Sequence, residues 1–451
     1  MPISIHEAAE TAFNERAQKL ISTAVKSHPH LQQSDTFPSE VPVSLSISEQ
    51  DITGAMEESV SDHNGRIIGR YFYIDVQRYA LDGRGYEALM ELAATVVRHG
   101  RIHDRLSAEY VEKVLFRWVV QCVRFPANQQ TFCTVLTSAS HRDIVKQNWW
   151  IPIANLEVEA EFTVGEIVIR PLSKAVIDTW SEQLTGVPEE YLKAVHAEFE
   201  KFRRQYQGRA AAYLVLESEP IRGMQLAIER TRSALSAMAL FSAGAFLPDV
   251  KCLAKPSGCE LLAQVTVLSE MHGVAGFTTT QAIVDLRSAQ PWRLSQSATT
   301  TLMRSGLGAL SGLLREQNLS QFKLAFLNGV LIYSKAAYSN EPIEKIIYIL
   351  SFLESMLLKN ENESIQQNLA ERMAVVLSKE LAERKRIIAN IRAVYGIRSR
   401  YLHHGNEKSE LDAVTDFMKN TWVFFTQVLG QLDKFQHQAD FASSIDDAKL
   451  S

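Results

Sequence analysis

The sequence contains little cysteine and no long apolar segment. Four cysteines occur among 451 residues, Cys122, Cys133, Cys252 and Cys259, and their separations do not match those of a metal site. We interpret them as reduced thiols of a cytoplasmic protein, because disulfides are rare in that compartment. No apolar run approaches the ~18 residues that a membrane-spanning helix needs, and the N-terminus lacks the apolar core of a signal peptide. We therefore expect neither a membrane partner nor a metal or other cofactor.

Hydrophobic residues make up 46% of the chain and charged residues 22%, which is typical of a soluble protein with ample material for cores. Alternating apolar residues predict a strand over Ile67–Val76 and a hairpin over Leu156–Leu172, one face of which is strongly acidic. Residues 246–292 contain several prolines and glycines and are expected to be irregular. We therefore predict an α+β fold, with a mixed N-terminal region of β-hairpins and helices followed by an all-α helical bundle. The expected domains are residues 1–150, a mixed α/β region; 151–310, a hairpin plus helices with a possible regulatory role; and 320–440, the bundle.

Periodic apolar positions predict that the chain is helical throughout its C-terminal part. The expected helices are Phe322–Ser339, Ile343–Leu358, Ser364–Leu377, Lys379–Arg400 and Leu411–Gln436. Short polar connections between them indicate antiparallel neighbours in a bundle.

Acidic residues are absent from positions 384–406, in a protein whose formal net charge is -5. The basic residues of this interval are Arg384, Lys385, Arg386, Arg392, Arg398 and Arg400, and they are followed by His403 and His404. Arginine binds phosphate through a planar, permanently charged guanidinium, and imidazole transfers protons near neutral pH. Together these residue types suit the cleavage of a phosphodiester. The residues that we expect to contact the nucleic acid are Arg384, Lys385, Arg386, Arg392 and Arg400.

These residues lie on a predicted helix. An apolar stripe is expected to face the core, formed by Leu381, Ile387, Ile388, Ile391 and Val394. Gly405 stands where a C-terminal cap falls, so both histidines belong to the end of the helix, where its dipole favours a protonated imidazole. On an ideal helix Arg398 and His403 are about 140° apart, whereas Arg400 and His404 are about 40° apart. A site that joins Arg398 to His403 in one chain therefore needs a bulge or a frayed helix end.

The arrangement Arg398-Ser399-x-x-x-His403 resembles the R-x4-6-H signature of HEPN domains, and most of all the ApeA-like branch, whose motif reads approximately R-S-x-x-x-H-G. One residue departs from that pattern: His404 stands where the family has glycine, and Gly405 arrives one position late. Either histidine is therefore a candidate for the working one. The resemblance extends upstream to about residue 321, and in it Phe352–Ser355 looks like the family's apolar helix with an inward glutamate, Glu354.

The resemblance implies a metal-independent endoribonuclease. In it His403 acts as general base or acid, Arg398 clamps the non-bridging phosphate oxygens, and Ser399 orients the arginine or donates to phosphate. His404 takes part of the proton transfer, and Glu354 pairs with Arg398 and holds its guanidinium in place. The substrate partner is RNA, and DNA is excluded because it lacks the attacking 2′-hydroxyl.

The resemblance also implies a homodimer formed through the C-terminal helical domain, with both motifs facing one cleft. Apolar residues of the flanking helices, Trp422, Phe424 and Phe425, are expected to supply the attraction between protomers. A freely active ribonuclease harms its host, so the region before about residue 320 is expected to restrain it and to sense an unidentified trigger. The function implied is bacterial defence against phage by growth arrest.

Two alternatives remain open. The first is a non-catalytic HEPN scaffold, in which the cations at the helix end only neutralise terminal carbonyls. The second is a nucleotide-binding regulator, suggested by Gly306-Leu-Gly308-Ala-Leu-Ser-Gly312, for which close helix packing is the simpler explanation. Separately, Trp149 and Trp150 have the chemistry to stack on a base, although core or interface positions fit them better.

Overall fold

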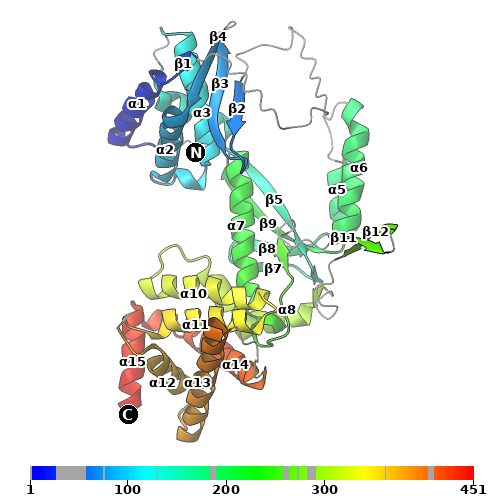
Figure 1. The fold of residues 1–451 in the computed structure, drawn as a ribbon, viewed down its shortest axis with the longest axis vertical. Coiled ribbons are helices and arrows are strands. Elements are labelled where there is room, and N and C mark those ends of the chain that lie inside the picture. The colour runs from blue at the N-terminus through cyan, green and yellow to red at the C-terminus, as the bar shows by residue number, and fades with distance from the viewer. Residues whose placement is uncertain are drawn as a thin grey trace. The chain divides into compact units, whose positions relative to one another are not determined.

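The computed structural model describes residues 3–26, 57–74, 77–127, 130–182, 189–256, 264–271, 274–281, 291–360, 362–404 and 411–450 (Figure 1). The predicted α+β fold class is confirmed, with sheets in the N-terminal half and helices in the C-terminal half. The chain divides into two compact units, residues 1–147 with 215–226 and residues 148–214 with 227–451. Residues of the predicted segments 151–310 and 320–440 thus both contribute to the second unit.

The first unit combines a four-stranded antiparallel sheet with helices. In the order β1-β4-β3-β2 the strands are β1 (Val25–Lys26), β4 (Gln77–Asp82), β3 (Ile67–Ile74) and β2 (Glu57–Ser61). The helices are α1 (Glu7–Ile21), α2 (Gly83–Arg98), η2 (Ile102–Asp104), α3 (Ala108–Arg124) and α4 (Phe132–Asp143). Phe72, Phe116 and Phe132 are fully buried in their common core. Glu112 is also buried, and Arg70 neutralises it through two hydrogen bonds, one of them 2.9 Å long.

The second unit begins with a five-stranded sheet. In the order β10-β5-β9-β8-β7 its strands are β10 (Lys255–Pro256), β5 (Val145–Ala154), β9 (Ala210–Ser218), β8 (Ile167–Pro171) and β7 (Phe162–Val164). The helices that accompany it are α5 (Lys174–Glu182), α6 (Glu189–Tyr206), α7 (Pro220–Ala239), η3 (Ala243–Ala245), α8 (Gln296–Leu302), η4 (Met303–Leu307) and α9 (Gly308–Leu313).

The predicted hairpin over Leu156–Leu172 is only partly correct. Strands β7 and β8 form it, and Gly165 adopts the positive φ of 58° that a two-residue turn between Val164 and Ile167 requires. The first three residues of the expected strand instead form β6 (Leu156–Val158), which pairs in parallel with β13 (Trp292–Leu294). Alternation of apolar and polar residues is the same in both pairings, so it could not distinguish them.

Residues 246–292 were expected to be irregular, and this was wrong for three strands, the short β10 and two longer ones. β11 (Gln264–Met271) and β12 (Val274–Gln281) pair antiparallel along their whole length. Their β-branched residues favour the strand, and glycines and prolines elsewhere in the segment masked that preference.

The helices of the C-terminal bundle confirm the five predicted from periodicity. They are α10 (Gln321–Tyr338), α11 (Pro342–Leu357), α12 (Ile365–Leu377), α13 (Leu381–His404) and α14 (Leu411–Leu429), followed by η5 (Leu432–Lys434) and α15 (Gln438–Leu450). Figure 1 shows them packed together in yellow to red. Aromatic rings fill the core, and those of Tyr333 and Phe352 stack with centroids 5.1 Å apart. The last predicted helix ends seven residues early, at Leu429 rather than Gln436, and α15 was not predicted.

The glycine-rich stretch after residue 305 is helical rather than a phosphate-binding loop. Gly306 has a φ of 124° inside η4, and a Cβ there would lie 3.4 Å from side-chain atoms of Leu429 and Phe241. A Cβ on Gly308 would lie 2.9 Å from the Met303 carbonyl oxygen. The positive φ at a kink between two helices accounts for Gly306, and close packing accounts for Gly308.

A buried lysine fixes the first half of α11. Lys345 is fully buried, and its Nζ donates to three backbone carbonyls, those of Gly244 at 2.7 Å, Leu247 at 3.0 Å and Val250 at 2.6 Å. Burial lowers the pKa of Lys345 to about 8. At neutral pH it remains an ammonium with three donors, which matches the three acceptors.

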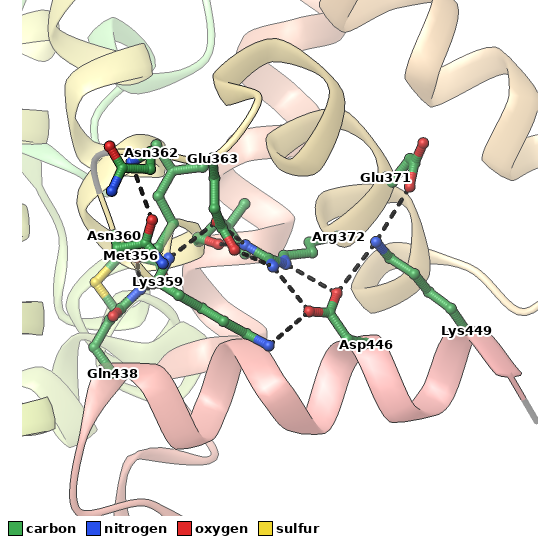
Figure 2. Close-up of polar contacts among 12 residues, drawn as sticks. Met356, Lys359, Asn360, Asn362, Glu363, Glu371, Arg372, Gln438, Asp446 and Lys449 are labelled. Atoms are coloured by element: carbon green, nitrogen blue, oxygen red, sulfur yellow. Dashed lines mark hydrogen bonds and ion pairs between the residues drawn. The ribbon is translucent and has the colours of Figure 1, made fainter.

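The other end of α11 is held by Arg372 of α12 (Figure 2). This buried guanidinium donates to the Leu357 carbonyl at 2.6 Å, and it forms two hydrogen bonds each with Glu363 and with Asp446 of α15. Lys359 and Lys449 approach Asp446 at 2.9 and 3.2 Å. Hydrogen bonds from Arg372 are the main reason that the pKa of Asp446 is well below its ordinary value.

Asp446→Asn should destabilise the bundle at pH 7 by about 2 kcal/mol, because a buried guanidinium loses one of its two carboxylates. A carboxylate with a lowered pKa in the folded state stabilises it above the unfolded pKa of about 3.9, and this contribution declines as the pH falls below that value. The stability difference between wild type and variant, measured by urea unfolding, should therefore shrink between about pH 5 and pH 3. Asp447→Asn, at an exposed neighbouring position, is the control. Parallel pH profiles for wild type and Asp446→Asn would contradict this account.

Candidate functional site

Helix α13 carries the candidate residues, and its buried face is set by apolar spacing. Ile387, Ile391, Val394 and Ile397 are buried at intervals of three and four and face the other helices of the bundle. Leu381 was expected to belong to this stripe, but it is 67% exposed. It is the first residue of the helix and lies six positions before the first buried residue.

Arg398 approaches Glu354 of α11, the pairing that the resemblance implied. The Arg398 Nη1 lies 3.6 Å from Glu354 Oε1, and the two side chains are 34% and 26% exposed. The Arg398 Nε is buried and has no hydrogen-bond partner within the described part of the chain. Glu354 therefore attracts the guanidinium without a hydrogen bond at this distance, and the partly exposed end of the Arg398 side chain can still meet an anion.

Tyr395 is part of this site, and the sequence analysis missed it. Its hydroxyl donates to Glu354 Oε1 at 2.9 Å, the same oxygen that Arg398 approaches. Burial and the negative charge of Glu354 raise the pKa of Tyr395, so the phenol stays protonated and remains a donor. A signal was present in the sequence, because Tyr395 precedes Arg398 by three residues and so shares its helix face.

The motif positions after Arg398 lie on other faces of α13 than Arg398 does. Ser399 is exposed, and the helix continues without a bulge through His404, the last residue that the structure describes before 411. The side chains of His403 and His404, and Gly405, lie outside the described part. In a regular helix Arg398 and His403 are about 140° apart, so one chain does not present them on a common face.

The predicted RNA-contacting residues fall into two groups. Arg384 Nε donates to the Ser378 carbonyl at 2.8 Å, and Arg386 pairs with Glu383 at 2.8 Å. The other three are exposed and form what we call the basic strip of α13, namely Lys385, Arg392 and Arg400. On an ideal helix Lys385 and Arg392 are about 20° apart, and position 403 has about the same angle as Lys385.

The aromatic residues expected at a dimer interface instead pack against residues of their own chain, so that expectation was wrong. Phe424 and Phe425 are fully buried within the bundle. The Trp422 indole Nε1 donates to the Leu240 carbonyl at 2.8 Å, and its ring meets Phe241 edge-to-face. Periodicity placed these residues on a helix but could not say whether their face met the same chain or another.

No family model, curated protein or solved structure matches this chain. Among the described helices, none has both the length and the apolar character needed to cross a bilayer. Within the same residues no group of three or more His, Cys, Asp or Glu side chains is arranged to hold a metal ion. The resemblance to HEPN domains therefore depends on the residues of α11 and α13.

Double-mutant cycles should separate the two contacts of Glu354. The Glu354→Gln and Tyr395→Phe pair should show a coupling of about 1–2 kcal/mol, because a partly buried carboxylate accepts a short hydrogen bond. The Glu354→Gln and Arg398→Met pair should couple by less than about 1 kcal/mol, because that contact is longer and reaches solvent. Urea unfolding measures both, and equal couplings or the reverse order would contradict this geometry.

Proposed function

We propose that the chain is a metal-independent endoribonuclease of the HEPN type, active in the cytoplasm. The observation that carries the proposal is the shared Glu354 oxygen, which Arg398 and Tyr395 approach from one face of α13 near its C-terminal end. A guanidinium so held is oriented before the substrate arrives, and that reduces the cost of positioning a phosphate. The acid-free interval from 384 to 406 adds a positive field along the same helix.

The proposed chemistry is an internal transfer. A base takes the proton from the RNA 2′-hydroxyl, whose oxygen attacks the adjacent phosphorus, and the bond to the 5′-oxygen breaks as an acid gives that oxygen a proton. The products are a 2′,3′-cyclic phosphate and a 5′-hydroxyl. Arg398 binds the non-bridging oxygens as negative charge develops on them, and His403, with His404, moves the protons. Ser399 donates to phosphate, and the basic strip binds neighbouring phosphates.

A site composed of two protomers fits the helix geometry better than a site in one. Arg398 and His403 lie about 140° apart on a helix without a described bulge, whereas Arg398 of one copy can meet His403 of a second. Two basic strips brought close together repel each other, and RNA phosphates between them relieve that repulsion. We therefore propose a homodimer through the C-terminal helices, formed by surfaces other than Trp422, Phe424 and Phe425.

The angle of about 140° between Arg398 and His403 also favours a second candidate function, a non-catalytic scaffold in which Arg398 only binds Glu354. The nucleotide-binding alternative is less favoured, because the glycine-rich stretch lies in helices that meet at a kink at Gly306, and Gly308 packs against the Met303 carbonyl. For the catalytic reading we further propose a role in growth arrest during phage infection. In that role the residues before about 320 restrain the enzyme and respond to a trigger.

Arg398→Ala and His403→Ala should each reduce RNA cleavage at least about a hundredfold, since each removes a group that acts on the reacting phosphate. The assay incubates purified protein with total RNA, with and without EDTA, and identifies cyclic phosphate ends. Cleavage should survive EDTA, and His404→Ala should have the milder effect.

Two controls make this assay decisive. Arg304→Ala, at an exposed position in the same unit, and His141→Ala, at an exposed position in the first unit, should cut normally. Each variant should also unfold within about 1 kcal/mol of wild type. Normal cutting by both Arg398→Ala and His403→Ala would reject the site, and absence of cleavage under all conditions would favour the scaffold.

Mixing Arg398→Ala protein with His403→Ala protein tests the composite site. If each site takes Arg398 from one copy and His403 from the other, a mixed dimer retains one complete site and recovers up to about a quarter of wild-type activity at equal subunit exchange. Mass measurement in solution should give a dimer. A monomer that still cuts RNA would contradict the composite site.

A further inference from the structure

The second unit contains a pocket that the proposed ribonuclease site does not use. It has a volume of about 690 Å³, within the range of small-molecule sites, and lies between β5, α5 and α6. Aromatic residues provide most of its wall: Trp150, Trp180, Tyr191, Phe199 and Phe202. Trp150 is half-buried and packs against a small core cluster of Leu172, Ile177 and Ala211, so one side of it meets the core and the other lines the pocket.

Two pairs of rings in this wall stand at steep angles, whereas the planes of Phe199 and Phe202 are tilted by 34°. Trp150 and Trp180 have centroids 4.9 Å apart and planes at 74°, and Trp180 and Phe202 have centroids 6.3 Å apart and planes at 61°. Planar ligands such as nucleobases are best held between parallel rings. Walls that meet nearly at right angles instead direct several ring faces at one point, and ring faces carry the negative part of the aromatic quadrupole.

The formal charge at the pocket is negative, like the partial charge of the ring faces. Among the described residues that line it, the single formal charge belongs to Glu198, and Asn148 adds an amide. Glu198 lies 3.5 Å from Lys201, but this exposed pair of side chains is weak and readily exchanged.

Cations next to the pocket already have acidic partners. The Arg170 guanidinium lies 5.3 Å from the Trp150 ring centroid and 2.9 Å from Glu161. Arg203 contacts Asp178 at 2.5 Å and Glu200 at 3.1 Å. Their charges are largely offset, so the field inside the pocket is set by Glu198 and the ring faces.

We propose that this pocket binds a small organic cation that carries a methylated or quaternary ammonium group. Such a group is large, weakly hydrated and unable to donate strong hydrogen bonds, so ring faces stabilise it better than a polar site does. Glu198 at the rim adds Coulomb attraction and disfavours nucleotides, whose phosphates it repels. This binding activity is independent of RNA cleavage.

The test uses choline as the probe, with its neutral tert-butyl analogue, in which carbon replaces nitrogen, and adenosine for comparison. Calorimetric titration of the full chain should show choline binding. The affinity of the neutral analogue should be at least about tenfold lower than that of choline. Trp180→Leu keeps an apolar side chain without a ring and should weaken choline binding at least about tenfold. Glu198→Gln should weaken it about threefold or more, whereas Glu380→Gln, at an exposed position that does not line the pocket, should have no effect.

The outcomes separate the possibilities. Equal binding of choline and its neutral analogue would reduce the pocket to an apolar site and overturn the proposal. Binding of adenosine without choline would overturn it in favour of base stacking, and absence of choline binding would overturn it outright. Because Glu198 is exposed, its variant should fold normally, and it therefore provides a clear result even if Trp180→Leu does not fold.

Discussion

The buried guanidinium of Arg372 is the constraint on which the geometry of the C-terminal bundle depends. It binds two carboxylates, Glu363 and Asp446, and a backbone carbonyl, and so joins the neighbouring helices α11 and α12 to α15, which is distant in sequence (Figure 2). A buried charge is costly unless its hydrogen bonds are complete, and a guanidinium has five donors to satisfy. The bundle can bury Arg372 only when α12, α15 and the end of α11 are all in place. The interaction therefore contributes specificity of packing as well as stability.

Helix α11 is fixed at both ends by cations of this kind. Lys345, near its start, binds three carbonyls of the segment from Gly244 to Val250, and Arg372 binds the carbonyl of Leu357 at its end. Glu354 lies one turn before that carbonyl. The carboxylate that orients Arg398 and Tyr395 is thus attached to a helix with little freedom to move. Such support is what a site needs if its guanidinium is to be positioned before substrate binds.

The proposed ribonuclease site and the aromatic pocket use positive and negative charge in opposite ways. From position 384 to 406 the absence of acids allows the basic strip to attract phosphate. At the pocket, neighbouring cations are offset by acids, so ring faces and one carboxylate determine what binds. The protein has a net charge of -5 and so is not attracted to RNA overall. Binding at the ribonuclease site and at the aromatic pocket therefore depends on the local distribution of charge.

The sequence by itself determined the local features. Apolar periodicity identified the five main helices of the bundle, and the run of basic residues identified the candidate helix. Residue spacing also showed that Arg398 and His403 diverge by about 140°, and the resemblance picked out Glu354 as the partner of Arg398. These results depend on neighbours in sequence, for which backbone geometry is fixed. Only the tertiary structure decided which faces meet: Phe424 and Phe425 turn into their own bundle, β6 pairs with β13, and Tyr395 shares the Glu354 oxygen. The reason is that one pattern of apolar and polar residues fits several partners, and only packing over the whole unit selects among them.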